Sequence, residues 1–256
     1  FNAPIAGVLF AYEALLRRIS VGAIAPIAVA SIVAYAANQA FFNLEPMLAV
    51  PDMSIELRPL IPFLIFTGVL SALTSVAYMA AIRKGRELAS RSGWSMPQLL
   101  VSCVVVVGSI SVVVPDVAGL GLTQINEMID AKFGLAMLFV LLAGKIFVTA
   151  YCLNTGFFGG VFGPALFVGA ATGAIVANVA ILAGLAPHLS YALPIAAIAA
   201  VGGAVIGAPL TAIMIVIELT GSYAYGLSAM LCAILCSLLT LRFFGLSYFC
   251  LLYTSP

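Results

Sequence analysis

Four long stretches of this chain contain no charged residue, and their lengths are the strongest constraint on its fold. They cover positions 19–44, 59–82, 92–115 and 219–241, which is 26, 24, 24 and 23 residues. A helix needs roughly 20 apolar residues to cross a bilayer. A fifth uncharged stretch, positions 146–217, has 72 residues and must fold back on itself, and we expect turns at Ala186-Pro187-His188 and near Gly202-Gly203. These lengths predict an all-α, polytopic membrane protein with about seven or eight helical passes, some of them too short to span.

Composition supports this fold class and excludes several functions. Hydrophobic residues make up 64% of the chain and charged residues 7%, against roughly 45–50% and about 25% in soluble domains. A net charge of +1 argues against nucleic acid as a partner. The five cysteines form no CxxC pair, so neither a disulfide framework nor a metal site is expected. No sequence feature points to a cofactor.

The signs of the charges orient the predicted spans. Arg17 and Arg18 form one basic segment, and Arg83, Lys84, Arg86 and Arg91 form another. Between them lie three acidic residues, Glu45, Asp52 and Glu56, while Asp116, Glu127 and Asp130 follow the second basic segment. Because Lys and Arg favour the cytoplasmic side of a membrane, both basic segments are predicted to lie inside.

Two short segments far apart in the chain resemble each other. Ala3-Pro4 is followed nine residues after the proline by Glu13, and Ala208-Pro209 is followed at the same distance by Glu218. Both read as short helices that a proline opens and a carboxylate closes, a pattern typical of the paired half-repeats of transporters. Coincidence remains the alternative. We expect Glu13 to pair with Arg17, four residues on, whereas Glu218 has no partner nearby in the sequence.

A second break in the apolar pattern lies at positions 156–164. The segment Gly156-Phe157-Phe158-Gly159-Gly160-Val161-Phe162-Gly163-Pro164 breaks a helix inside lipid, where irregular backbone survives only if it is buried or lines a cavity. The proline then opens a new helix, whose first amides carry partial positive charge. This predicts an anion site at the amides of Val161 and Phe162. The alternative is that the glycines only allow close helix packing.

These residues resemble the CLC family of chloride channels and proton-coupled chloride transporters. The family motif GxFxP stands here as Gly160-Val161-Phe162-Gly163-Pro164, preceded by Lys145, Thr149 and Gly159. The segment from Phe1 to Glu13 is similar to the family's first dimer-interface helix. The segment from Ala208 to Thr220, followed by Tyr223, is similar to the partner of that helix. The resemblance extends from residue 1 to about 248 and leaves 249–256 as an atypical tail.

The resemblance implies a fold, a substrate and a partner. It implies an inverted-repeat membrane domain with broken helices, in which Gly160 to Pro164 hold chloride with the hydroxyl of Tyr223. An interfacial anchor is the alternative role for this tyrosine. The resemblance also implies a homodimer through the helices starting at Pro4 and Pro209, in a prokaryotic plasma membrane. Lys145 is either a pathway charge that attracts anions or a structurally paired residue.

Two departures from the family pattern bear on the mechanism. The family's gating-glutamate and pore-serine motifs would lie upstream of Phe1, so we expect the chain to be part of a longer protein. Many proton-coupled members carry a proton-relaying glutamate directly after the position of Glu13, where this chain has Ala14. The sequence therefore favours passive chloride flow, with chloride/proton exchange as the alternative.

Other function classes have less support. An intramembrane enzyme needs a nucleophile with a base or a metal-binding histidine pair, and the chain has a single histidine. Water channels carry Asn-Pro-Ala twice, whereas Asn2-Ala3-Pro4 has a different order and occurs once. A membrane scaffold without transport activity stays open, although it leaves the glycine-proline break unexplained.

Overall fold

The structure, a computed structural model, describes residues 2–17, 21–42, 48, 50 and 56–245. This part of the chain is helical and contains no strand. Glu45, Asp52 and the tail 249–256 lie outside the described residues. The helices are α1 (Pro4–Phe10), α2 (Val21–Phe42), α3 (Leu57–Arg91), α4 (Met96–Val113), α5 (Leu122–Ile129), α6 (Leu135–Asn154), α7 (Phe162–Leu182), α8 (Pro187–Ser190), α9 (Ala192–Ile206), α10 (Pro209–Thr220) and α11 (Tyr223–Phe244). A π-helical turn, η1 (Ala11–Leu16), extends α1, and a 3₁₀ turn, η2 (Pro115–Val117), follows α4.

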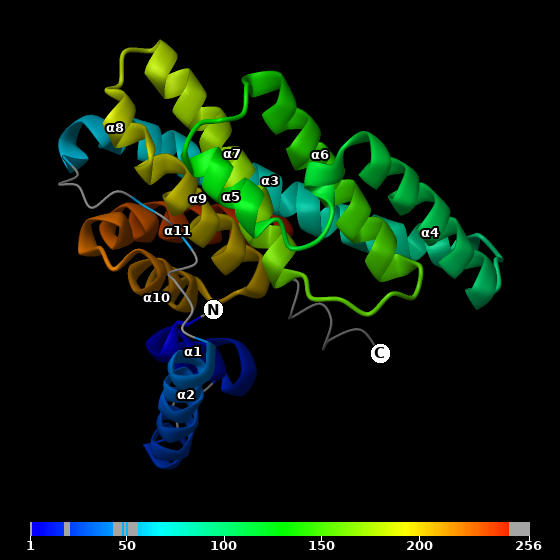
Figure 1. Cartoon of the computed structure of the whole chain (residues 1–256), viewed down its shortest axis with the longest axis horizontal. Helices are drawn as coiled ribbons and strands as arrows, with labels where there is room; N and C mark the ends of the chain where they lie inside the picture. Colours follow the sequence, from blue (N-terminus) through cyan, green and yellow to red (C-terminus); the bar gives the residue numbers. More distant parts are fainter. Residues whose placement is uncertain (1, 18–20, 43–47, 49, 51–55, 246–256) are drawn as a thin grey trace.

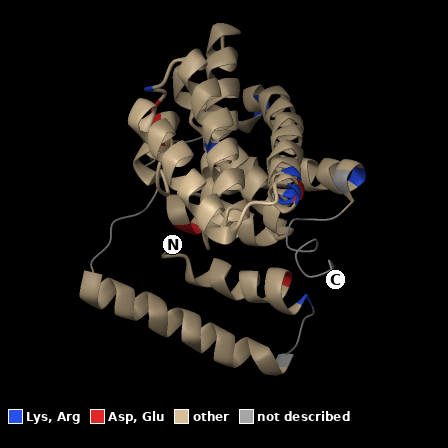
Figure 2. Ribbon diagram, turned by 90° about the vertical axis from the view of Figure 1, so that its right-hand side faces the viewer, with Lys and Arg blue, Asp and Glu red and all other residues tan. Residues whose placement is uncertain are grey.

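The polytopic helical fold is confirmed, and the expected count of about seven or eight passes, short ones included, is slightly low. Within the described residues, seven helical stretches are long and apolar enough to cross a membrane. Two shorter apolar stretches, Pro4–Leu16 and Pro209–Thr220, match the two half-length helices that the internal repeat predicts. Long tracts of ribbon carry no charge (Figure 2).

The core of the fold is the pair α7 and α9, with α3, α6, α10 and α11 around it (Figure 1). Every residue of α9 is buried, and so is most of α7. Small residues allow the two backbones to approach each other, because a Cβ added at Gly169 would lie 2.6 Å from the carbonyl oxygen of Ala197. Close backbone contact of this kind is how helices associate where lipid supplies no hydrophobic driving force.

One predicted turn is wrong by a few residues. Ala186-Pro187-His188 does break the chain, at the start of α8. The second turn falls after Gly202-Gly203, at Gly207, whose φ of +79° suits a residue without a Cβ. The Gly203 carbonyl accepts hydrogen bonds from the amides of Gly207 and Ala208, at 2.8 and 3.0 Å. Gly203 stays helical because it packs against α10, where an added Cβ would lie 3.0 Å from the Pro209 Cα.

The two short helices are each followed by a long one, as an internal repeat requires. α2 and α11 are both 22 residues long. Both short helices have an alanine at the N-cap with similar backbone angles, φ −126° and ψ 78° at Ala3 and φ −134° and ψ 67° at Ala208. The elements α1 and α2 lie together on one side of the helical body, with α10 next to α1 (Figures 1 and 2).

Candidate anion pathway

The glycine-rich segment breaks the chain between α6 and α7. Residues 155–161 connect the two helices, and Gly156 has a φ of +98°. Pro164 lies in the first turn of α7, where its missing N–H costs no helical hydrogen bond. First-turn amides have no acceptor within their own helix. The start of α7 at Phe162 therefore directs the positive end of a 21-residue helix toward the break.

A cavity of about 320 Å³ lies beside this break. Gly159, Gly160 and Pro164 line it from the break and from α7, and Lys145 and Thr149 line it from α6. The structure thus brings together the glycine-proline motif and the two α6 residues that the sequence associates with it. No carboxylate is among the described residues that line the cavity.

Lys145 is a buried cation in the middle of a membrane-spanning helix. Its side chain is 2% exposed. Its Nζ donates to the carbonyl oxygens of Val117 and Gly119, at 2.9 and 2.6 Å, and lies 4.5 Å from the ring centroid of Phe167. Within the described ranges no carboxylate pairs with it. The carbonyl and ring contacts hold the ammonium in place but leave its full charge at the cavity wall.

Tyr78 of α3 is a site residue that the sequence analysis did not find. Its hydroxyl donates to the carbonyl oxygen of Val161, at 3.1 Å, and its side chain is fully buried. The same oxygen accepts the amide of Ala165, at 3.1 Å. Because the Val161 carbonyl and the Phe162 N–H belong to one peptide group, the two bonds fix the direction of that N–H. The only sequence signal is a tyrosine in an apolar helix, which equally describes an interfacial anchor.

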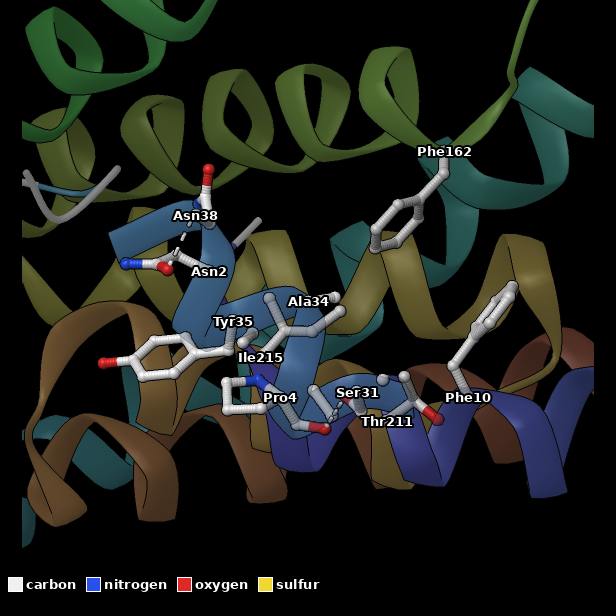
Figure 3. Close-up of a pocket in the computed structure, with 13 residues that line it drawn as sticks. Asn2, Pro4, Phe10, Ser31, Ala34, Tyr35, Asn38, Phe162, Thr211 and Ile215 are labelled. Carbon is white, nitrogen blue, oxygen red and sulfur yellow. Dashed lines mark hydrogen bonds between the residues drawn. The ribbon is translucent and has the colours of Figure 1, made fainter. Parts of the chain in front are cut away.

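A second cavity of about 580 Å³ lies between α1, α2, α7 and α10. Phe10 and Phe162 stand at one end of it, and Asn2, Tyr35 and Asn38 at the other (Figure 3). The segment 160–164 therefore contributes to both cavities, with Gly160 and Pro164 lining the smaller and Phe162 the larger.

Ala14 lies close to this junction. It is 5% exposed and packs with Ile206 and Ala208 in a small apolar cluster that Phe10 and Phe162 flank. The position at which the family resemblance implies a proton-relaying glutamate is thus a buried alanine next to the glycine-proline motif. It belongs to η1, a π-helical turn, a local geometry frequent at functional sites.

The two repeat carboxylates each bind the start of the opposite short helix. The oxygens of Glu218 accept the amides of Ile5 and Ala6, at 2.8 and 2.7 Å. The oxygens of Glu13 accept the amides of Leu210 and Thr211, at 3.0 and 2.7 Å, and Oε2 also accepts the Thr211 hydroxyl, at 2.8 Å. We call these contacts the carboxylate clasps. They require α1 and α10 to run antiparallel, side by side.

The geometry of the clasps follows from the sequence. A proline at the first position of each helix removes one N–H, and the fourth amide bonds the N-cap carbonyl, at 3.0 Å for Gly7 and 3.1 Å for Ala212. Two amides per helix then need acceptors, and alanine at the N-cap offers no side-chain acceptor. A carboxylate has two oxygens, which match the two amides.

The clasps correct one prediction and complete another. Glu13 binds α10 and not Arg17, because η1 is π-helical and ends at Arg17 in the left-handed region, at φ +53°, so regular four-residue spacing is lost. Glu218, which has no partner nearby in the sequence, finds it in α1.

The structure does not bring Tyr223 to the anion motif. α10 has 12 residues and is therefore about 18 Å long. Its first residues adjoin the cluster that contains Phe162, whereas Tyr223 follows its other end. The Tyr223 side chain is 71% exposed in this chain. The expected hydroxyl contact with chloride stays a prediction that this placement does not support, because a full short helix separates Tyr223 from Val161 and Phe162.

Comparison with known proteins bears on the identity of this fold. The sequence matches the voltage gated chloride channel family over residues 1–241. The chain belongs to this family. A protein of Ralstonia nicotianae named as a ClcB-like chloride channel protein is 30% identical over 239 residues, covering 91% of this chain and 55% of the relative. An H(+)/Cl(-) exchange transporter ClcA of Vibrio vulnificus is 26% identical over 257 residues, covering 92% of this chain and 54% of the relative.

Solved CLC structures share the fold. A slow cyanobacterial Cl⁻/H⁺ antiporter superposes with a TM-score of 0.88 at 20% identity, over 98% of this chain and 60% of that one. A CLC-type fluoride/proton antiporter gives a TM-score of 0.76 at 19% identity, over 97% and 60%. The chain spans about half the length of the curated relatives it matches. It is thus a multi-pass membrane segment with a partial CLC fold.

Proposed function

We propose that this chain forms one half of an anion pathway through a membrane and that chloride, or a similar small anion, passes it passively. The observation that carries the proposal is that α7 starts at a cavity that the buried Lys145 also lines. No carboxylate of the described residues pairs with this lysine. An anion there would meet the positive end of a helix and a full positive charge. Gly160, Val161, Phe162, Gly163 and Pro164 are the residues proposed to hold it.

Energetics favour backbone amides as the main ligands. Each charge-assisted hydrogen bond returns about 1.5–3 kcal/mol, so a few donors offset much of the dehydration of an entering anion. Conduction requires sites that are weak and multiple. Lys145 meets this requirement because two of its N–H groups already bind the carbonyls of Val117 and Gly119, which leaves its charge to act mainly through the field in the cavity.

Passive flow is proposed over exchange because of Ala14. A proton relay at this position needs a titratable side chain, and the small apolar cluster around Ala14 contains none. The alternative, chloride/proton antiport, has support in the names of relatives and solved structures described as exchangers and antiporters. It requires a proton route that avoids position 14.

Chloride efflux from liposomes, with proton movement recorded at the same time, tests this function. The protein is purified and reconstituted at its natural full length. Chloride efflux without proton movement is the expected result. Chloride efflux that drives protons uphill would establish antiport and refute the inference from Ala14. Absence of any anion flux would leave a membrane scaffold as the better description.

We also propose that the protein is a homodimer through α1, α10 and the helices that follow them. α2 packs mainly against α1 and exposes apolar side chains over most of its length, including Val29, Ile32 and Val33, each about three-fifths exposed. The mass of the detergent-solubilised protein by multi-angle light scattering tests this. A monomer mass at all protein concentrations would refute it. We further propose a prokaryotic plasma membrane, which the bacterial relatives support, with Arg17 and the basic end of α3 on the cytoplasmic side.

A further inference from the structure

We propose that a third cavity, between the ends of α3, α4 and α6, binds an anionic phospholipid. The cavity has a volume of about 400 Å³. Leu88 of α3, Leu99 of α4 and Phe147 of α6 are among its apolar walls, and Lys84 and Trp94 stand among them. It shares none of its lining residues with the two cavities at the anion motif.

Charge at this cavity selects an anionic occupant. Four basic residues lie within nine positions at the end of α3, with a single acidic residue among them, Glu87. These basic residues are Arg83, Lys84, Arg86 and Arg91. No carboxylate lines the cavity within the described part of the chain. Basic pockets between membrane helices on the cytoplasmic side are suited to anionic lipid headgroups.

The length of α3 places the cavity at the edge of the hydrocarbon. α3 has 35 residues, so it is about 52 Å long, whereas the hydrocarbon core is about 30 Å thick. Its basic end therefore reaches the headgroup region while its apolar part crosses the bilayer. By the charge distribution this end faces the cytoplasm, the side on which anionic lipids provide a negative surface.

The turn between α3 and α4 holds the indole of Trp94 at the cavity. The Trp94 amide donates to the Ser92 hydroxyl oxygen, at 3.2 Å, and that hydroxyl donates to the Ala89 carbonyl, at 2.7 Å. Ser95 and Gln98 then form a capping box that fixes the start of α4. Trp94 is 53% exposed, and a half-exposed tryptophan next to basic residues is typical of the membrane interface.

These features together fit one occupant, a phospholipid with an acyl chain in the cavity and its phosphate near Lys84. The apolar walls disfavour a soluble anion, and Lys84, the basic residue among the lining, favours an anionic headgroup over a zwitterionic one. The site does not depend on the proposed chloride function. It adjoins the break all the same, because Asn154 and Thr155 line the cavity and Gly156 follows directly.

Trp94 is the single tryptophan of this chain and serves as a local probe. The protein at its natural length is placed in phosphatidylcholine nanodiscs, and phosphatidylglycerol with brominated acyl chains is added in steps. The reverse series uses brominated phosphatidylcholine, and Trp94→Phe gives the background. Trp94 fluorescence should fall in a saturable way with both lipids. The mole fraction that gives half-maximal quenching should be at least about fivefold lower for the anionic lipid than for phosphatidylcholine. Lys84→Gln should reduce this preference about fivefold, as one basic residue near the surface contributes.

Lys132→Gln is the matched control, because Lys132 is exposed at the opposite end of α6 and pairs with Asp130, at 3.2 Å. It should leave the quenching unchanged. Ala89→Phe tests the cavity without changing its charge and should also weaken the anionic preference. Equal quenching by both lipids, or an unchanged preference in Lys84→Gln, would refute the proposal. Relief of the quenching by inorganic phosphate would refute it in favour of a soluble-anion site.

Discussion

Removing one carboxylate clasp should destabilise the contact between α1 and α10 by a measurable amount. Glu218→Ala deletes both acceptors of the Ile5 and Ala6 amides, which lie at 2.8 and 2.7 Å. A hydrogen bond to a charged group contributes about 1.5–3 kcal/mol, so the loss should be about 3–6 kcal/mol. Glu218→Gln keeps one oxygen but directs an NH₂ group at the second amide. Its cost should be about 2–3 kcal/mol.

The free energy of unfolding in mixed micelles measures the global effect, and hydrogen exchange of the peptide that contains residues 2–17 measures the local one. Ala6 is 1% exposed, so water does not readily replace the lost acceptor, and exchange at its amide should accelerate. Glu56→Gln is the control, because Glu56 is exposed and its side chain caps no amide. If Glu218→Gln costs no more than the control, within about 0.5 kcal/mol, the clasp does not stabilise the fold.

The internal repeat makes a symmetric test available. Glu13 accepts three hydrogen bonds, from the Leu210 and Thr211 amides and the Thr211 hydroxyl, so Glu13→Gln should cost at least as much as Glu218→Gln. Both clasps join the same two helices, so the double variant should depart from the sum of the single effects. A large loss in one variant and none in the other would contradict the equivalence of the two ends.

Three further outcomes follow from the site and the fold. Lys145→Met removes the charge at the cavity wall and should lower chloride flux at least tenfold in liposomes, whereas Lys132→Met should not, and equal flux in both would exclude a pathway role for Lys145. Tyr78→Phe removes one of the two hydrogen bonds to the Val161 carbonyl and should raise the chloride concentration for half-maximal transport several-fold, whereas an unchanged value would separate this bond from anion binding. Cys103 and Cys152 are free thiols with sulfurs 3.7 Å apart, so a thiol oxidant should form a disulfide between α4 and α6. After limited proteolysis the fragments that contain these two helices should then run as one band on a non-reducing gel. Its absence at full oxidation would contradict this packing.

The sequence predicts the spans well because lipid imposes a simple rule. A bilayer requires about 20 apolar residues per crossing, so uncharged stretches locate the long helices without any knowledge of packing. The second turn of the long uncharged stretch is misplaced because its position depends on helix packing, which the length rule does not describe. Gly202-Gly203 has the composition of a break, yet helix packing against α10 uses the missing side chains and the chain turns only at Gly207.

The site is predicted only where its signal is local. The glycine-proline motif is contiguous, and it lines a cavity that Lys145 also lines. The partner of Glu13 lies 197 residues away, beyond any pattern of neighbouring residues. The four-residue spacing therefore led to the wrong prediction of an ion pair with Arg17. Tyr223 follows the repeat closely in sequence, but α10 carries it to the far end of the short helix.

The clasps and the proposed anion site use the same chemistry, and the difference between them indicates where an external anion can bind. At α1 and α10 the positive helix start is bound by a carboxylate of the chain itself. At α7 the cavity beside the helix start is lined by Lys145, and no carboxylate is among its described lining residues. A negative charge supplied by the chain would occupy the position of a transported anion, whereas a buried cation raises the potential there. The starts of α1 and α10 thus hold the halves of the repeat together, whereas the partial positive charge at the start of α7 acts on the cavity.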